Sequence, residues 1–287
     1  MTTNSFFSSV DSFSENLSKN NIKVCVIGIG RIGLPTALSF ANKNLPTIGV
    51  DINTELVNSI NSGKYPLDDE PEFDKIFDKV TKNKFFSATD NISEALTKSN
   101  VVILSLPTPM DKNCVPNYSA LFSVAKDLHD FIQHETLIIV ESTVEPGFIE
   151  DEFIKIVEGK NKKLTCNVDF SIVACPETAN PGEIFSDFHK LPRLIGGFDE
   201  RFSQITAELY HHVFDVEIIH LPNCKTANAA KLTANVFRDV NIAFINELAM
   251  LFEKMDIDIM KVIEACDRKY NFQAHYPGSG VGGPCLP

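Results

Sequence analysis

Three glycines between a short apolar run and a helical stretch constrain the fold of this 287-residue chain more than any other feature. The apolar run covers residues 22–27 and the helical stretch residues 32–42, and the chain between them reads Gly-Ile-Gly-Arg-Ile-Gly. A short apolar run closed by glycine is typical of a strand buried in a parallel sheet. A second apolar run, residues 47–50, ends in Asp51. This order of strand, glycine turn, helix, strand and acid is that of a dinucleotide-binding βαβ unit.

Each glycine of the turn has its own physical task. Gly28 permits the tight turn, Gly30 lets the backbone approach a pyrophosphate, and Gly33 lets the helix pack closely on the strand. Asp51 follows at a spacing where a carboxylate binds ribose hydroxyls and repels the 2′-phosphate of NADP. We therefore expect NAD as the cofactor, the alternative being a structural turn without a ligand. The turn residues expected to bind it are Gly28, Ile29, Gly30, Arg31, Ile32 and Gly33.

Apolar runs and helix-like segments continue to alternate beyond this unit. Further runs cover residues 101–106, 137–140 and 170–174. Strands separated by helices of about 10–15 residues imply right-handed βαβ units and a parallel sheet. The predicted fold is α/β, a Rossmann-like doubly wound parallel sheet followed by a long central helix and a small helical region.

The domain organisation follows from changes in composition and period. The Ser- and Asn-rich residues 1–20 are interpreted as a disordered polar leader. Residues 21–222 are expected to form an NAD-binding Rossmann domain. Residues 223–287 are expected to form a central helical region for dimerisation and catalysis.

Polar turns follow three of the predicted strands. Ligands of open α/β sheets bind outside the carboxyl ends of the strands, so Pro107, Thr108 and Thr143 are expected to face the cofactor. Taken alone, the two threonines are more typical of helix caps than of site residues. A third strand runs into Pro176 and Glu177.

A long helix is predicted over residues 225–255, which contain neither Gly nor Pro. At 1.5 Å per residue it would be roughly 45 Å long, so we expect it to bridge two domains or to pack against its copy in a dimer. Lys231 and Asn235 share one face, although a lysine there is also interpretable as an ordinary surface residue lying along the helix. The apolar stripe consists of Phe237, Val240, Phe244, Leu248 and Leu251.

A glycine-rich segment at the C-terminal end carries the most reactive group. Gly278, Gly280, Gly282 and Gly283 precede Cys285, so backbone can approach a ligand and the sulfur is presented without steric cover. A nearby lysine would favour the nucleophilic thiolate. The alternative is a flexible tail with an incidental cysteine.

Composition excludes several classes of protein. The formal net charge of −12 disfavours nucleic-acid binding. No run approaches the roughly 18 apolar residues of a membrane helix, and residues 1–20 lack the basic head of a signal peptide. The seven cysteines contain no C-x-x-C pair, so we expect a cytoplasmic protein without a metal site.

Together, these motifs resemble the UDP-glucose/GDP-mannose dehydrogenase family from about residue 23 to the last residue. The resemblance rests on the glycine turn with its acid, the P-T-P, S-T and P-E turns, and two longer motifs. K-L-x-x-N-x-F-R-D-V-N-I-A-x-x-N-E covers residues 231–247, and G-x-G-G-x-C-[IL]-P covers residues 280–287. The helix wording is more similar to the UDP-N-acetylmannosamine and UDP-N-acetylglucosamine 6-dehydrogenases than to the UDP-glucose branch.

The resemblance implies an NAD-dependent four-electron oxidation of a UDP-sugar 6-hydroxyl to a uronic acid, for surface polysaccharide precursors. Cys285 would form a thiohemiacetal and then a thioester, and Lys231 and Asn235 would stabilise the oxyanion. Thr143 would help position water, and Glu177 would contact substrate or assist proton transfer. The substrate-binding set implied is Glu177, Lys231, Asn235, Gly278, Gly280, Gly282 and Gly283.

The chain also departs from the family. An aspartate four residues after the cysteine and a C-terminal UDP-binding domain are missing from the sequence, which implies truncation after the nucleophile loop and puts turnover by this chain alone in doubt. The expected partners are a UDP-sugar and a second copy bound through residues 225–255, without nucleic acid or membrane. The alternatives are a two-electron 3-hydroxyacid or 6-phosphogluconate type of dehydrogenase, and a non-catalytic NAD-binding, dimerising remnant.

Overall fold

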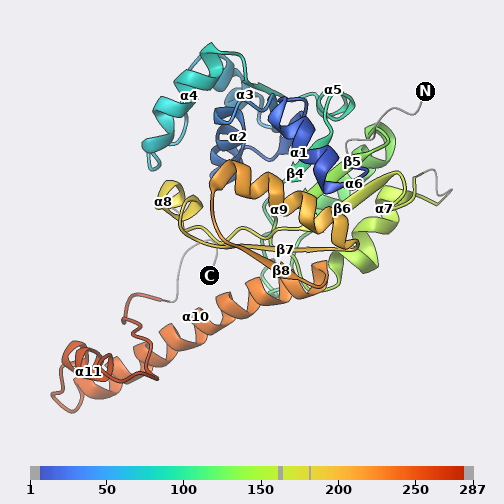
Figure 1. The fold of residues 1–287 in the computed structure, drawn as a ribbon. Coiled ribbons are helices and arrows are strands. Elements are labelled where there is room, and N and C mark those ends of the chain that lie inside the picture. The colour runs from blue at the N-terminus through green and yellow to red at the C-terminus, as the bar shows by residue number, and fades with distance from the viewer. Residues whose placement is uncertain (1–6, 161–163, 181, 281–287) are drawn as a thin grey trace, which may run out of the picture. The chain divides into compact units, whose positions relative to one another are not determined.

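The computed structural model describes residues 7–160, 164–180 and 182–280 (Figure 1). Contacts between residues divide the chain into two compact units, residues 1–229 and residues 230–287.

An eight-stranded sheet is the centre of the first unit as the structure describes it, with the order β3-β2-β1-β4-β5-β6-β7-β8. All neighbouring pairs are parallel except β6 and β7, which are antiparallel. The strand order reverses direction between β1 and β4, which creates the switch point of a doubly wound sheet. The strands are β1 (Val24–Ile27), β2 (Thr47–Val50), β3 (Phe86–Thr89), β4 (Val101–Leu104), β5 (Thr136–Val140), β6 (Phe170–Ala174), β7 (Arg193–Gly197) and β8 (Ile218–Leu221).

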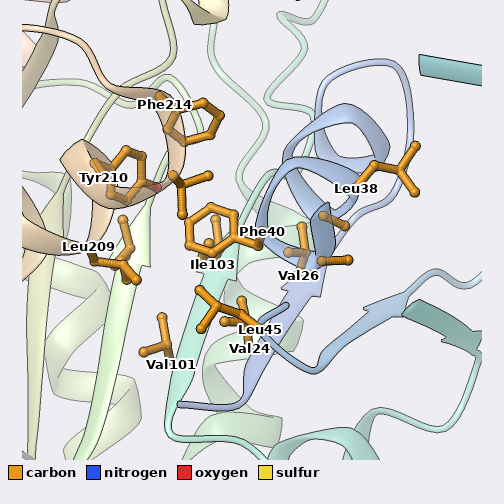
Figure 2. Close-up of a cluster of buried hydrophobic side chains, with 14 of the residues drawn as sticks. Val24, Val26, Leu38, Phe40, Leu45, Val101, Ile103, Leu209, Tyr210 and Phe214 are labelled. Carbon is orange, nitrogen blue, oxygen red and sulfur yellow. The ribbon is translucent and has the colours of Figure 1, made fainter. Parts of the chain in front are cut away.

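Helices cover both faces of this sheet. Successive residues of a strand point to opposite faces, and in β1 Val24 and Val26 join one buried cluster while Cys25 and Ile27 join another. Figure 2 shows residues of the first cluster, among them Val24 and Val26 of β1 together with Phe40. The helices of that face are α1 (Val10–Ser18), α2 (Gly33–Asn42), α3 (Thr54–Asn61), α4 (Glu72–Lys82), α8 (Ile184–Phe188) and α9 (Glu200–Phe214). Those of the other are α5 (Ile92–Thr97), α6 (Ser119–Phe131), the π-helical turn η1 (Ile149–Phe153) and α7 (Ile154–Glu158). The predicted fold class is confirmed.

The expectation of a disordered polar leader is wrong for residues 7–18. Val10–Ser18 form α1, whose N-cap Ser9 accepts a hydrogen bond from the Ser12 N–H. Phe13 and Leu17, one turn apart, are buried, and Phe7 stacks on Phe13 with ring centroids 5.8 Å apart. The few apolar residues of this Ser-rich segment therefore fall on one helical face, which packs on the domain.

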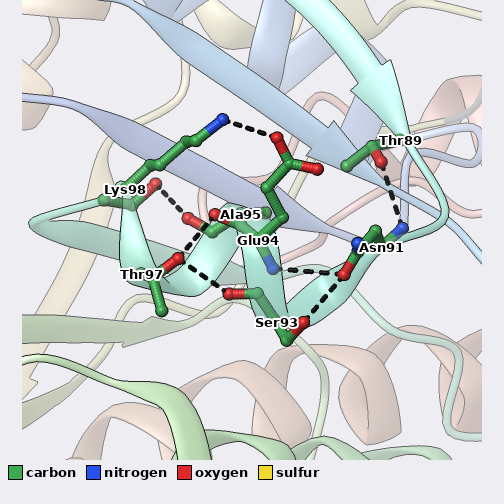
Figure 3. Close-up of polar contacts among 8 residues, drawn as sticks. Thr89, Asn91, Ser93, Glu94, Ala95, Thr97 and Lys98 are labelled. Atoms are coloured by element: carbon green, nitrogen blue, oxygen red, sulfur yellow. Dashed lines mark hydrogen bonds and ion pairs between the residues drawn. The ribbon is translucent and has the colours of Figure 1, made fainter.

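The edge of the sheet next to β2 is fixed by side-chain capping. Figure 3 shows Asn91 accepting a hydrogen bond from the Glu94 N–H at 3.2 Å, which caps α5, while Thr89 accepts one from the Asn91 N–H. The carbonyl of Thr89 also accepts a hydrogen bond from the N–H of Asp51 at 3.2 Å. The end of β3 thus holds the residue that follows β2.

The second unit consists of helix and loop. The helix α10 runs from Cys224 to Glu253, within two residues of the prediction at each end, and continues from the first unit into the second. It is followed by α11 (Ile259–Cys266) and a loop that reaches Gly280, the last described residue.

Candidate cofactor and active site

The glycine turn has the backbone geometry that its three tasks require. Gly28 adopts a φ of +87°, in the left-handed region that favours glycine. A Cβ atom on Gly33 would lie 1.8 Å from the carbonyl oxygen of Gly28, so only glycine lets α2 start this close to β1. A Cβ atom on Gly30 would meet no heavy atom within 4 Å, so the turn is open on that side. The turn therefore combines a tight bend with an open backbone face, as a pyrophosphate site at a helix N-terminus requires.

Asp51 lies directly beside the glycine turn. Its Oδ2 accepts a hydrogen bond from the N–H of Ile29 at 3.1 Å, and its Oδ1 accepts one from the N–H of Asn53 at 2.9 Å. Each oxygen keeps further acceptor capacity for a ribose hydroxyl. The neighbouring Arg31 instead forms an exposed ion pair with Asp69. Asp51 is thus held beside the glycine turn, at the β2 side of the switch point.

The turns after β4 and β5 are joined to each other. The Thr108 hydroxyl donates to the carbonyl oxygen of Thr143 at 2.7 Å, and the Ser142 hydroxyl accepts from the Leu106 N–H at 2.8 Å. Neither threonine caps a helix, because the N-caps of α6 and η1 are Tyr118 and Phe148. Pro107 precedes Thr108 and is exposed. The structure therefore brings together the two turns that the sequence assigned to the cofactor.

Glu177 is held by the chain on both of its carboxylate oxygens. Its Oε2 forms a buried ion pair with Arg193, and its Oε1 accepts hydrogen bonds from the N–H groups of Thr178 and Ala179, each at 2.7 Å. The Arg193 guanidinium lies between two aromatic rings, 4.6 Å from the centroid of Phe188 and 4.5 Å from that of Phe214. This arrangement fixes the turn after β6.

Sequence reasoning missed a second buried acid, Glu141, whose exposed fraction is 2%. The Tyr210 hydroxyl donates to its Oε1 at 2.6 Å, and the Thr36 hydroxyl donates to its Oε2 at 3.4 Å. Burial, together with the negative charge of Glu177, raises the pKa of Glu141 to about 7, against the opposing effect of Arg193. Its position was the available signal, because an acid at the end of an apolar strand, directly before a polar turn, is expensive to bury.

The predicted sugar-facing residues of the second unit lie on α10. Lys231 and Asn235 are half-buried and one turn apart. At 100° per residue, their face points away from the apolar stripe that runs from Phe237 to Leu251. A shallow hollow of about 640 Å³ opens on the stripe side of the helix and is lined by Ala230, Thr233, Ala234, Phe237, Arg238, Gln273 and His275.

The start of the glycine-rich loop is tied to the same helix. The Gly278 N–H donates to the Oδ1 atom of Asn246 at 2.9 Å, a contact that sequence reasoning did not single out. Nothing lies within 4 Å of a Cβ atom built on Gly280. Gly282, Gly283 and Cys285 lie outside the described residues.

Two features are absent from the residues that the structure describes. Within them, no group of three or more His, Cys, Asp or Glu side chains is arranged to hold a metal ion. Within the same ranges, no helix is both long and apolar enough to cross a membrane.

A doubly wound sheet with a glycine turn at its switch point and an acid after the second strand defines a dinucleotide-binding domain. Residues 22–214 match the UDP-glucose/GDP-mannose dehydrogenase family, NAD binding domain, and residues 225–287 match the central domain of that family. The chain belongs to the UDP-glucose/GDP-mannose dehydrogenase family. The first unit contains the NAD-binding domain of the family, so the expected cofactor is confirmed.

Relatives and solved structures agree with this assignment. The chain is 36% identical to UDP-N-acetyl-D-mannosamine dehydrogenase of Pyrococcus horikoshii, over 93% of this chain and 62% of the relative. It is 35% identical to Protein CapL of Staphylococcus aureus, over 93% of this chain and 60% of that protein. The solved UDP-D-ManNAc dehydrogenase structure from P. horikoshii superposes with a TM-score of 0.86 at 34% identity, covering 92% of this chain and 62% of that one. The chain thus spans about three fifths of the length of these relatives.

A solved 3-hydroxyisobutyrate dehydrogenase of Mycobacterium tuberculosis is also similar, with a TM-score of 0.63 at 16% identity. It covers 92% of this chain and 78% of that one. At that identity the likeness shows the fold alone.

Proposed function

We propose that this protein carries out, or supplies the NAD-binding and central parts for, the oxidation of a UDP-N-acetylhexosamine at carbon six to the uronic acid. The observation that carries the proposal is the 36% identity to a UDP-N-acetyl-D-mannosamine dehydrogenase across both family regions. UDP-N-acetylmannosamine and UDP-N-acetylglucosamine are the two candidate substrates, because relatives named for each sugar are similar to this chain. The uronic acid would serve as a precursor of surface polysaccharide.

The reaction balances as one alcohol, two NAD and one water giving one carboxylate, two NADH and three protons. Bound NAD supplies the hydride acceptor for each of the two oxidations. The Gly28–Gly33 turn and Asp51 hold the cofactor through backbone N–H groups and ribose hydrogen bonds. Thr108 and Thr143, in the joined turns after β4 and β5, would contact its nicotinamide half.

The chain's own groups supply the remaining chemistry. The Cys285 thiolate attacks the carbon-six aldehyde and forms a thiohemiacetal, whose oxidation gives a thioester. Lys231 and Asn235 donate hydrogen bonds to the oxygen that becomes negatively charged. Thr143 orients the water that cleaves the thioester and returns the thiol. Glu177, fixed by Arg193, contacts the substrate from the turn after β6.

The substrate-facing backbone belongs to the glycine-rich segment. Asn246 anchors it at Gly278, and the open space around Gly280 lets backbone groups approach the sugar. Gly282 and Gly283 extend this backbone toward Cys285 in the sequence.

The same proposal includes a homodimer formed through the helix at residues 225–255. Four of the five stripe residues are about half exposed, with Phe244 at 54% and Val240 at 58%. A contiguous apolar stripe on a long helix is typical of an interface between copies. The stripe lies on the helix face opposite to Lys231 and Asn235, so dimerisation and substrate contact would not compete.

The proposal is tested by counting NADH per sugar, with the sugar limiting and NAD in excess. The panel contains UDP-N-acetylmannosamine, UDP-N-acetylglucosamine, UDP-glucose and GDP-mannose. We expect two NADH from one N-acetylhexosamine, loss of this yield in Cys285→Ala, and no change in the matched control Cys114→Ala, an exposed cysteine.

Two other outcomes would change this conclusion. One NADH per sugar that is insensitive to Cys285→Ala would contradict the proposal and indicate a two-electron dehydrogenase. No NADH with any sugar, while NAD still binds, would contradict turnover by this chain and would indicate a non-catalytic NAD-binding and dimerising chain.

A further inference from the structure

Glu141 is the centre of a buried polar cluster that lies next to the turns after β4, β5 and β6. The Glu141 carboxylate is hydrogen-bonded by Thr36 of α2 and Tyr210 of α9, which are far away in the sequence. The backbone of Glu141 takes part as well, because its N–H donates to Leu104 and its carbonyl accepts from the Glu177 N–H. The acid therefore links the helix that begins at the glycine turn to the turns after β4, β5 and β6.

Among the described groups of this cluster, Glu141 is the acid whose negative charge is not balanced by a cation. The groups that face it are Tyr210 from α9, Arg193 from β7, and Cys175 and Glu177 from the turn after β6, while α2 contributes the neutral Thr36. Glu177 and Arg193 neutralise each other as an ion pair. Loss of a proton from Glu141 therefore adds an uncompensated negative charge inside a region of low dielectric.

The fold places this charge near one particular half of the cofactor. Asp51, after β2, marks the adenosine ribose, and the glycine turn after β1 marks the pyrophosphate. The nicotinamide half of a bound cofactor would consequently extend toward the ends of β4 and β5. Glu141 follows the last residue of β5 and is two residues before Thr143.

We propose that Glu141 is a specificity-determining residue for the redox state of the cofactor, its ionised carboxylate favouring NAD⁺ over NADH. The oxidised nicotinamide ring carries a positive charge and the reduced ring is neutral, whereas the adenosine and pyrophosphate halves are the same in both. A buried anion at the end of β5 would therefore act on the difference between the two affinities. In an oxidising enzyme this favours binding of the oxidised cofactor and release of the reduced one.

The test measures the dissociation constants of NAD⁺ and of NADH for the full chain by calorimetry between pH 6 and pH 8.5. For the wild type, we expect the ratio of the NADH constant to the NAD⁺ constant to rise with pH, by about fivefold, as Glu141 ionises. In Glu141→Gln, which keeps the shape and both hydrogen-bond positions, the ratio should not depend on pH. The matched control Glu152→Gln removes an exposed carboxylate and should behave as the wild type does.

A second variant keeps the proposal testable if Glu141→Gln fails to fold. Tyr210→Phe removes the hydroxyl that donates to the ionised carboxylate, so the pKa of Glu141 should increase and the rise in the ratio should move to higher pH. A ratio independent of pH in the wild type overturns the proposal. So does a pH dependence that survives in Glu141→Gln, or an equal loss of both affinities at every pH, which is the signature of a purely structural role. None of these readouts depends on turnover of a sugar, so the proposed reaction can fail while this inference stands.

Discussion

The two compact units of this chain bury their apolar residues to very different degrees. In residues 1–229 helices cover both faces of the sheet, and even the N-terminal helix contributes Phe13, which is fully buried. In residues 230–287 the long helix carries an apolar stripe of which four of the five members are about half exposed, as Phe244 is. The first unit has an extensive core of its own, whereas the described part of the second leaves most of its apolar stripe exposed.

This difference separates cofactor binding from the proposed chemistry. The glycine turn and Asp51 belong wholly to the first unit, and so does the cluster of Glu141, Tyr210 and Arg193. Lys231, in the second unit, is among the groups proposed to act on the sugar. Changes at the glycine turn should therefore alter stability and NAD affinity, whereas changes in the second unit should alter association and turnover.

The largest effect is expected at Gly33. Gly33→Ala places a Cβ atom 1.8 Å from the backbone oxygen of Gly28, so α2 must move away from β1. We expect NAD binding to be lost and the free energy of unfolding to fall by ~3 kcal/mol or more, as measured by denaturant unfolding and calorimetry. Gly30→Ala, which meets no atom of the chain, is the control: it should stay folded and lose only NAD affinity. Equal stability of both variants would show that the turn is not packed as described.

The next effect tests whether the N-terminal helix belongs to the first unit. Phe13→Ala removes a fully buried ring that stacks on Phe7, and should lower the free energy of unfolding by about 3 kcal/mol. Phe131→Ala, at a partly exposed ring, should cost well under half as much. A negligible effect of Phe13→Ala would contradict the packing of residues 7–18 on the first unit and would indicate a polar leader.

A smaller effect is expected from the pH dependence of stability. Because the folded state raises the pKa of Glu141 from 4.5 to about 7, the folded protein holds this proton more tightly than the unfolded chain does. The contribution is present below the unfolded pKa and is lost as pH rises through the folded pKa, so stability should fall by about 2–3 kcal/mol across this window. In Glu141→Gln this component should be absent from unfolding curves recorded at pH 5 and pH 8. An identical pH slope in variant and wild type would contradict the burial of an ionisable acid.

The smallest effect on the stability of the first unit is expected from a substitution in the apolar stripe of the second unit. Phe244→Asp should halve the mass measured by light scattering, because a charge at a half-exposed apolar position disrupts the proposed interface. NAD affinity and the unfolding of the first unit should change by less than about 0.5 kcal/mol. A dimer that survives this substitution, as well as Val240→Asp, would place the interface elsewhere.

The sequence predicted those parts of the fold whose signal is local. The strands β1, β4, β5 and β6 are short apolar runs because both of their faces are buried, and the glycine turn is specified by backbone geometry alone. The strands β3, β7 and β8 were missed. β7 begins with the charged Arg193, and β8 is only half covered, so neither has a continuous apolar pattern. The antiparallel pairing of β6 with β7 is a long-range property that no local pattern reveals.

The candidate site also contains residues with a local sequence signal and residues without one. Gly28, Gly33 and Asp51 were predicted because they occur within one βαβ unit of fixed spacing. Glu141 and Tyr210 are 69 residues apart and meet only in the folded chain, so sequence reasoning could not pair them. Phe13 and Leu17 were hidden for a different reason, because two apolar residues in a Ser-rich segment give too weak a helical period.

The central claim, that the first unit binds NAD and the second supplies groups for the chemistry, is tested most directly by Lys231→Ala. Calorimetric titration with NAD and the NADH yield per UDP-N-acetylhexosamine would be measured on the same preparations of variant and wild type. We expect the variant to have an NAD dissociation constant within about twofold of that of the wild type. The wild type should yield two NADH per sugar, and the variant should lose this yield. A variant that loses NAD affinity, or that keeps the full yield, would contradict it.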